Sequence, residues 1–547
     1  MPATAARRPA AVPVTVAACA ALALALRAYQ LSRPGYLLGV TEYDDGVLFG
    51  NALRLVSGVI PYRDFAMVQP PGSALLMAPV ALLAKGTGTA WGLAVARILT
   101  VCADTANVVL LGVLVRHRGP VTAGVACGLY AVYPDALVAA HTFLLEPWLN
   151  LCCLAAAALI FDGDRLATAD TRRLALGGAA FGFGVAVKIW AVVPLVLVGL
   201  LLAVTARQPR PSAPRTSLLR ALAARARPAA ALAAGAVAGL GAPLAPFAVL
   251  APGGLARGVL VGQLVRNASG GRDLTGRLAE LAGAPGLLSL PGRFPRPLLL
   301  AAIGAVIAGL YAAAYLAAGR RPAALDAYAQ LGAVAVTGML LWPRLYYPHY
   351  GAFDAPFLAL AVALPVGQLS RGLLSRGPRP GGRPAASRAA GAVLATLLAA
   401  AVAAAGVGQF RAESRLAGTQ VAVAADRLIP AGACVVTNDS AYTVAAGRFY
   451  SDVAGCPAMT DSFGTMIAMT SGRPRDASAA VLAPVVALWQ ATLQQAAYVW
   501  LTGDTVAQIP WTRQLDSYFL SHFRLIGFAG PPTGYRYVPR PGLYIRR

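Results

Sequence analysis

Charged residues are scarce in this chain of 547 residues, where Asp, Glu, Lys and Arg make up 12% and hydrophobic residues make up 58%. Apolar runs rich in Ala, Leu and Val recur for most of its length instead, and each has about the 20 residues that cross a roughly 30 Å hydrocarbon core. Only helices and closed barrels satisfy their backbone groups in lipid. We therefore predict an all-α polytopic membrane protein.

Acidic residues are the scarcer charged class, with 22 Asp and Glu against 46 Lys and Arg, which gives a net charge of +24. In a soluble chain this excess would point to nucleic acid. Here the arginines flank apolar runs, where they orient membrane spans. We therefore expect membrane lipids as partners and no nucleic acid. Lysine is nearly absent, with only Lys85 and Lys188.

The distribution of arginine predicts the orientation of the spans. The first apolar run, 11–30, follows two arginines and lacks a convincing cleavage site, so we interpret it as a retained span with a cytoplasmic N-terminus. Segments 207–227 and 371–388 are rich in Arg and lack acids, which places them in the cytoplasm. About eleven transmembrane helices and an external C-terminus in the cell membrane follow. The later predicted spans are 91–115, 119–140, 142–161, 174–188, 190–206, 229–250, 297–318, 324–342, 352–370 and 389–409.

The chain divides near residue 410 into two predicted domains. Residues 1–409 form the transmembrane domain, with a first external loop over 31–90 that contains a short apolar stretch, 73–84, expected to be interfacial or re-entrant. Residues 410–547 alternate short β-like runs, turn residues and helix-like stretches, which predicts an extracytoplasmic α/β domain.

Cysteine is also sparse and shows no metal-binding spacing. Cys434 and Cys456 are the only two in the exported domain, where a disulfide is the simplest interpretation and a pair of free thiols the alternative. The other five lie in apolar runs and are expected to be inert.

Against this apolar background, four acids gather in "GVTEYDDGVLFGNALRLVSGVIPYRDFAMVQPPG", residues 39–72: Glu42, Asp44, Asp45 and Asp64. A solvated loop is the simplest interpretation. It does not explain why two acids precede a glycine and an amphipathic run that is suited to the membrane surface. A carboxylate at such a boundary is partly desolvated, and a raised pKa suits a general base. We predict that Asp44 and Asp45 are catalytic.

Other scarce polar residues fall on the same predicted external side. Lys188 stands alone between two apolar halves, where it either snorkels to the headgroups or pairs with an anionic substrate group such as a lipid phosphate. His141 is either structural or a metal ligand. Glu146 either caps a helix or is a second active-site carboxylate.

The segment "WPRLYYPHYGAFD", 342–354, combines aromatic residues with cations. It is either an interfacial aromatic belt or, through Arg344 and His349, a contact for phosphate or pyrophosphate.

These motifs resemble a known group of proteins. The acidic pair in the first external loop, followed by "PYRDF" and "QPPG", is similar to integral-membrane glycosyltransferases of the GT-C superfamily. The most similar branch contains the aminoarabinose transferases, the protein mannosyltransferases and the actinobacterial cell-wall mannosyl- and arabinosyltransferases. The Gly-rich segment ending at Lys188 and the "YYPHYGAF" segment support the same resemblance, which covers about 30–410.

The resemblance implies a GT-C fold and an inverting transfer of a sugar from a polyprenyl-phosphate-linked donor. The acceptor would be a cell-envelope glycan, lipid or protein on the external face. Asp44, or less favourably Asp45, would be the base. The retained carboxylates permit a divalent Mg or Mn ion without requiring one. The resemblance assigns the donor phosphate to Lys188, Arg344, His349 and Tyr347, and leaves Glu42, Asp64, His141 and Glu146 as acceptor or metal candidates.

The sequence also departs from parts of this family. Gln69 stands where the aminoarabinose branch commonly has a lysine before the Pro-Pro pair, which puts a phosphate contact there in doubt. The Trp-Trp-Asp-Tyr-Gly signature of oligosaccharyltransferases is absent. A transporter or flippase of lipid-linked sugar is the main alternative; it would need ionisable residues near the bilayer midplane, of which Asp104, near Arg97, is the best example. A non-enzymatic envelope scaffold is the third option.

Overall fold

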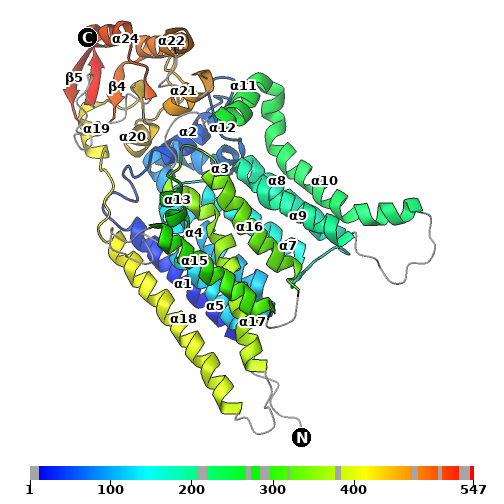
Figure 1. Ribbon diagram of the computed structural model, residues 1–547. Helices are drawn as coiled ribbons and strands as arrows, with labels where there is room; N and C mark the ends of the chain where they lie inside the picture. The colour runs from blue at the N-terminus through cyan, green and yellow to red at the C-terminus, as the bar shows by residue number, and fades with distance from the viewer. Residues whose placement is uncertain are drawn as a thin grey trace.

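The structure is a computed structural model that describes residues 11–206, 218–265, 273–283, 296–316, 321–375, 384–470, 478–502, 508–528 and 542–547. A bundle of helices forms one part of the molecule, and a smaller α/β region near the C-terminus packs on one end of it (Figure 1). Arg7 and Arg8 and much of the arginine-rich segments 207–227 and 371–388 lie outside the described residues.

The long helices of the bundle follow the apolar runs of the sequence. One predicted span, 119–140, is divided into two helices that are bent by 57°. The break falls at Pro134, which lacks a backbone N–H and keeps the residue before it extended. The bundle helices are α1 (Ala11–Leu31), α4 (Thr89–Val115), α5 (Pro120–Val132), α6 (Pro134–Ala140), α7 (Glu146–Ile160), α8 (Thr171–Val187), α9 (Val192–Ala206), α10 (Leu218–Leu250), α15 (Arg296–Tyr311), α16 (Ala324–Leu341), α17 (Ala355–Ser375) and α18 (Pro384–Glu413).

Length and composition alone give fewer spans than the predicted eleven. Within the described ranges, 5 helices are long and apolar enough to cross a membrane, or up to 6 if the bent pair is one span. Several further apolar helices, including α7, have only 10–17 residues. The polytopic character is therefore confirmed, and the number of spans stays a prediction.

Shorter elements connect these helices and form the first loop. Helices α2 (Tyr43–Val56) and α3 (Gly72–Thr87) lie between α1 and α4, so the stretch 73–84 is helical as expected. The remaining connecting elements are 3₁₀ turns at Arg116–Arg118, Ile189–Ala191 and Pro348–Phe353, a hairpin of β1 (Phe161–Asp162) and β2 (Arg165–Leu166), helices α11 (Pro252–Ala256), α12 (Gly262–Val265) and α13 (Leu274–Leu281), and π-helical turns at Arg257–Val261 and Ala312–Leu316.

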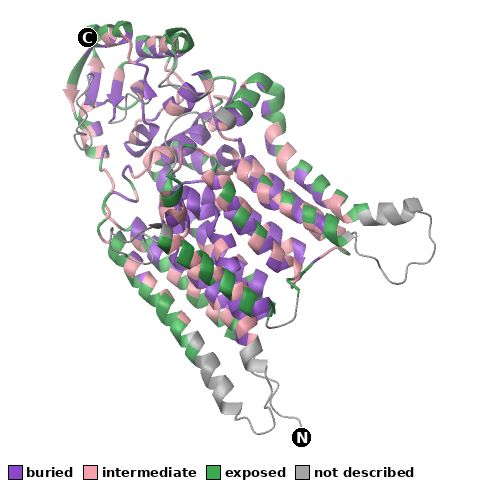
Figure 2. Cartoon of the chain, in the orientation of Figure 1, coloured by how far each residue is buried: buried purple, intermediate pink, exposed green. Residues whose placement is uncertain are grey.

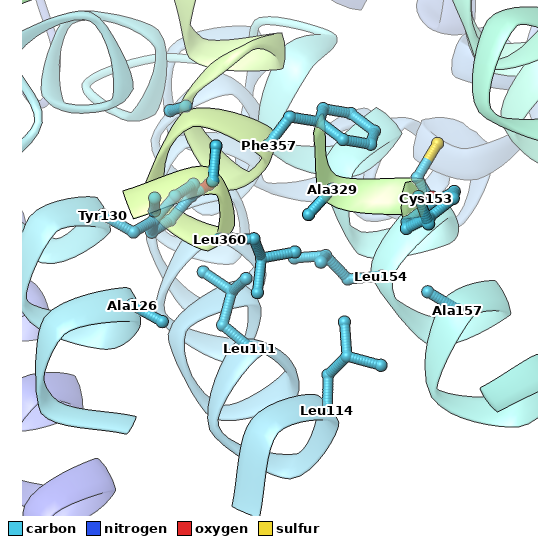
Figure 3. Packing of buried hydrophobic residues seen from close by; sticks show 14 of the residues in the cluster. Leu111, Leu114, Ala126, Tyr130, Cys153, Leu154, Ala157, Ala329, Phe357 and Leu360 are labelled. Atoms are coloured by element: carbon cyan, nitrogen blue, oxygen red, sulfur yellow. The ribbon is translucent and has the colours of Figure 1, made fainter. Parts of the chain in front are cut away.

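The centre of the bundle is a packed apolar core (Figure 3). Leu111 of α4, Tyr130 of α5, Leu154 of α7 and Leu360 of α17 meet there and are almost fully buried. Outside this core, large apolar side chains on α10, α15 and α18 are exposed, as the green faces of Figure 2 show. Lipid tails would cover such faces, which agrees with a membrane location.

Glycines allow α8 and α10 to approach closely. A Cβ at Gly178 or Gly182 of α8 would lie 2.1 Å from a backbone oxygen of α10. Gly235 and Gly239 of α10 face backbone oxygens of α8 in the same way. Small residues at such crossings are a common means of packing helices in membranes.

The C-terminal region contains a four-stranded sheet in the order β3-β4-β6-β5. β3 (Val435–Thr437) is parallel to β4 (Tyr498–Leu501), whereas β6 (Gly542–Arg546) is antiparallel to β4 and to β5 (Phe523–Gly527). A disulfide joins Cys434 to Cys456, the pair that the sequence suggested. The helices of this region are α19 (Ala422–Leu428), α20 (Ser440–Ala445), α21 (Ser462–Thr470), α22 (Ala479–Gln495) and α24 (Arg513–His522).

Candidate active site

The acidic loop begins a helix that is buried and does not lie on a surface. Glu42 caps α2 by accepting a hydrogen bond from the Tyr43 amide at 3.2 Å, and two acids occupy the first turn, where the helix dipole favours negative charge. All residues from Asp45 to Arg54 are buried. The expectation that this amphipathic run lies on the membrane surface is therefore wrong. Helix α2 packs between α3 and α4 on one side and the C-terminal region on the other.

Asp45 points into the bundle and is fully buried. Its carboxylate pairs with the Arg97 guanidinium at 2.6 Å and accepts a hydrogen bond from the Thr142 hydroxyl at 2.5 Å. Arg97 also donates to the carbonyl oxygens of Tyr36 and Leu37. Asp45 thus ties α2 to α4 and to the loop before α7.

Asp44 projects from a different side of α2, because successive residues of a helix are about 100° apart. Its side chain is 36% exposed, and its Oδ2 lies 3.9 Å from Nε2 of His349. It opens onto a polar pocket, which we call the reaction pocket. The described residues that line it are Asp44, Val47, Leu48, Val68, Gln69, Leu144, Leu145, Glu146, Lys188, His349, Tyr350 and Asp461.

Lys188 lies in the wall of this pocket and is turned inward. It follows the last residue of α8, and its ammonium group pairs with the Glu146 carboxylate at 2.5 Å. The ammonium also lies 3.6 Å from the centre of the Trp190 ring and 4.4 Å from that of Tyr350, within the range of cation–π attraction. Only 5% of Lys188 is exposed, so snorkelling to the headgroups is excluded.

The aromatic segment before α17 contributes only part of what we predicted. His349 is buried in the reaction pocket, and the ring of Tyr347 stacks on it with centroids 5.7 Å apart. The described lining of the pocket includes neither Tyr347 nor Arg344, which are both exposed. Arg277 of α13 donates to the carbonyl oxygens of Pro343 and Arg344, which fixes this loop against α13.

Three other candidates lie elsewhere. Burial, followed by the charges of Asp44 and Asp45, raises the pKa of Glu42 to about 7. Hydrogen bonding to Arg63 lowers the pKa of Asp64, whose carboxylate is 2.8 Å from that guanidinium. The Nδ1–H of His141 donates to the Val138 carbonyl oxygen three residues before it, which favours the structural role.

No metal centre is formed by the residues that the structure describes, since they contain no group of three or more His, Cys, Asp or Glu side chains placed to hold an ion. Asp44, Glu146 and Asp461 line one pocket but are not grouped in this way.

The C-terminal region supplies a pocket residue that the sequence interpretation missed. Asp461 is 6% exposed and accepts hydrogen bonds from the Tyr43 hydroxyl at 2.9 Å and from the Gly464 amide at 2.6 Å. The bond from the Gly464 amide is that of a helix N-cap. The local sequence, Asp-Ser-Phe-Gly before an apolar run, indicates this capping role and no role in the pocket. Its contact with the first loop is formed only in the folded chain.

Close contact between α2 and the C-terminal region places Asp461 at the pocket. A Cβ on Gly46 of α2 would lie 2.1 Å from the Ala441 amide nitrogen of α20, and one on Gly50 would lie 2.7 Å from Thr460. One turn further, Arg54 donates to the Tyr450 carbonyl oxygen at 2.9 Å. Burial lowers the pKa of Arg54 to about 10. The C-terminal region is therefore part of the wall of the site.

Comparison with known proteins gives a match at the level of fold. No family model matches the chain, and no curated protein matches it by sequence. Its structure is similar to that of ArnT from Cupriavidus metallidurans bound to undecaprenyl phosphate, with a TM-score of 0.55, 14% identity and 97% of each chain covered. The apo structure of the same protein gives a TM-score of 0.53 and 15% identity, over 85% of this chain and 92% of that one. The chain thus shares its fold with ArnT, as the resemblance of its motifs to membrane glycosyltransferases predicted.

Proposed function

We propose that this chain is a membrane glycosyltransferase that moves a sugar from a polyprenyl-phosphate-linked donor to an acceptor hydroxyl on the external face. One observation carries the proposal: an accessible carboxylate, Asp44, and a buried cation, Lys188, line the same small pocket. The pocket occurs in a fold shared with ArnT, which has been solved with undecaprenyl phosphate bound. We further propose that the acceptor is a cell-envelope glycan, lipid or protein.

Asp44 is the better candidate for the general base. A base must contact the proton that it removes, and Asp44 opens onto the pocket. Asp45 is fully buried and already accepts hydrogen bonds from Arg97 and Thr142. Protonation of Asp45 would also leave the Arg97 charge uncompensated inside the bundle, at a high cost in free energy.

Lys188 is suited to the donor side. In the proposed reaction, the acceptor oxygen forms a bond to the anomeric carbon as the bond from that carbon to the phosphate oxygen breaks. The hydroxyl proton passes to Asp44, and the polyprenyl phosphate departs with one additional negative charge. Lys188, held by Glu146 and by two aromatic rings, stabilises that charge in a site with little water.

His349 is placed to act on the base. Its Nε2 is 3.9 Å from Asp44 Oδ2, and its ring is fixed between Tyr347 and Tyr350. We propose that it orients the Asp44 carboxylate toward the acceptor. The Mg or Mn ion that the carboxylates would permit has no three-residue site among the described residues, so no step is assigned to it.

The residue that best supported the transport alternative has a structural role. Asp104, the ionisable residue expected near the midplane, is buried and pairs with Arg27, and the Tyr130 hydroxyl donates to it at 2.5 Å. Arg97, expected beside it, pairs with Asp45 instead. These groups already have partners inside the bundle.

The test is transfer of radiolabelled sugar from synthetic polyprenyl-phosphate donors by purified protein. We expect Asp44→Asn to lower the turnover rate by about 10²–10⁴-fold, the usual contribution of a general base. The matched control is Asp426→Asn, which changes an exposed acid of α19 outside the pocket and should leave the rate unchanged. Full activity of Asp44→Asn would refute the base assignment, and no turnover with any donor would refute the transferase.

A further inference from the structure

A second and larger cavity, of about 320 Å³, lies next to the reaction pocket, and we call it the outer cleft. Three parts of the chain form it: the first loop, α11 with the π-helical turn that follows it, and the C-terminal region. The described residues that line it are Tyr62–Met67, Gly254, Arg257, Gly258, Pro457–Met459, Thr465, Ala468, Met469, Leu488 and Thr492. None of them has a role in the transfer proposed above.

The backbone around the cleft is tightly constrained. A Cβ on Gly254 would lie 2.1 Å from the Tyr62 carbonyl oxygen, and one on Gly258 would lie 2.0 Å from that of Met67. Tyr62 itself has a φ of 67°, a left-handed conformation that costs a non-glycine residue about 1–3 kcal/mol and is concentrated at functional sites. The Tyr62 hydroxyl holds the loop by donating to the Gln69 carbonyl oxygen at 2.5 Å.

The lining combines an apolar floor with one uncompensated positive charge. Phe65, Met67, Met469 and Leu488 supply apolar surface. At the rim, Arg63 is paired with its neighbour Asp64 through two contacts of 2.8 and 2.9 Å. The exposed side chain of Arg257 has no carboxylate within ion-pairing distance among the residues that the structure describes. Guanidinium groups favour phosphate and carboxylate partners.

Two segments lead from the cleft to the reaction pocket. Met67 lines the cleft, and the next two residues, Val68 and Gln69, line the pocket. On the opposite side, Met459 lines the cleft and Asp461 lines the pocket. Since consecutive Cα atoms are about 3.8 Å apart, a bound molecule needs to extend only about 8 Å beyond Met67 to reach Gln69 in the lining of the reaction pocket.

We propose that the outer cleft binds the acceptor, and that the acceptor is an anionic amphiphile. Its phosphate or carboxylate contacts Arg257, its apolar part lies on the floor of the cleft, and its hydroxyl reaches the reaction pocket. The identification of the ligand as the acceptor rests on the proposed transferase function. The affinity for an anionic amphiphile does not, because it follows from the lining alone.

The test measures protection of a cysteine placed in the cleft, in the full chain in neutral detergent. Ala468→Cys on α21 is labelled with N-ethylmaleimide with and without dodecyl phosphate, and the chain without the added cysteine gives the background. We expect dodecyl phosphate to slow labelling at least about fivefold, and neither dodecanol nor inorganic phosphate to do so at the same concentration. Arg257→Gln should raise the dodecyl phosphate concentration that gives this protection at least about tenfold. Arg427→Gln, which changes an exposed arginine of α19, should not.

Three results would overturn the proposal. The first is no protection by dodecyl phosphate, and the second is equal protection in the Arg257→Gln chain or by dodecanol or inorganic phosphate. The third is equal protection by undecaprenyl phosphate, which would assign the cleft to the donor. The labelling test and the transfer test are separable, since labelling needs no turnover. If the Asp44→Asn chain transfers no sugar but dodecyl phosphate still protects Ala468→Cys, the proposed binding by the outer cleft stands. If sugar transfer is normal but dodecyl phosphate gives no protection, the proposed binding by the cleft is refuted and the transferase function is not.

Discussion

At the scale of single residues, the neighbours Asp44 and Asp45 have different surroundings. One carboxylate opens onto the reaction pocket and the other is buried beside Arg97. Adjacent positions on a helix point in different directions, so a single turn of α2 can hold both an accessible acid and a structural one. The two are therefore separable by mutation.

We expect Asp45→Asn to destabilise the protein by about 3–5 kcal/mol, because it leaves the Arg97 charge buried without its partner. Thermal unfolding in detergent measures this, with Asp44→Asn as the matched control, since Asp44 is partly exposed and should affect stability little. Equal unfolding temperatures for Asp45→Asn and the unmodified chain would contradict the structural role.

Glu42 predicts a dependence of stability on pH. Its pKa is about 7 in the folded chain against 4.5 in the unfolded chain, so between these values the folded state binds the extra proton. The contribution of Glu42 to the free energy of unfolding therefore falls as pH rises from 4.5 to 7, by up to about 3 kcal/mol.

The test of this effect is Glu42→Gln, which keeps an oxygen to cap α2 but does not ionise. The difference between its stability and that of the unmodified chain should be near zero at pH 4.5 and largest at pH 8, in favour of the variant. Thermal unfolding at both values measures it. A difference that does not change with pH would refute the raised pKa.

The sequence predicted much of the reaction pocket and misplaced the rest for physical reasons. Asp44, Glu146, Lys188 and His349 were identified because ionisable groups are costly in apolar surroundings and are therefore conspicuous in the sequence. The exposure of Arg344 depends on how Arg277 fixes its loop, which no local pattern encodes. Asp461 was missed because its contact with the first loop spans more than 400 residues.

At the scale of elements, α2 is the link between the bundle and the C-terminal region. Phe49 and Ala52 pack toward α3 and α4, while Gly46 and Gly50 lie against α20 and its surroundings. Apolar runs predicted the positions of the long helices well. The burial of α2 was not predictable, because an amphipathic pattern does not distinguish a lipid surface from a protein surface.

We expect Gly46→Val to lower both the activity and the stability of the chain, because its side chain would displace α2 from the backbone of Ala441. Overpacking of this kind costs about 1–3 kcal/mol. The matched control is Gly86→Val in α3, where an added Cβ meets nothing within 4 Å. Thermal unfolding and sugar transfer measure the two effects, and unchanged values for Gly46→Val would show that the close contact is dispensable.

At the scale of the whole molecule, the bundle carries clusters of polar groups at both ends. The reaction pocket and the outer cleft lie at the end that carries the C-terminal region. Near the hairpin that joins α7 to α8, Asp164 accepts from Arg118 and contacts His117, each at 2.6 Å, and these contacts hold the pKa of Asp164 at about 2. The predicted topology places this second end in the cytoplasm.

Labelling with a membrane-impermeant maleimide in intact cells tests that topology. Arg63→Cys, at the rim of the outer cleft, should be labelled from outside, whereas Arg165→Cys in the hairpin should be labelled only after the membrane is permeabilised. Both positions are exposed, so accessibility to the reagent is matched. External labelling of Arg165→Cys would reverse or refute the topology.

The contact between Gly46 and Ala441 also has a consequence for biosynthesis. The ribosome makes α2 early and α20 about 400 residues later, which at about 5–20 residues per second is a delay of roughly 20–80 s. During that interval the face of α2 that will meet α20 has no partner from the same chain. The reaction pocket is therefore complete only after the C-terminal region has been made and has folded onto the first loop.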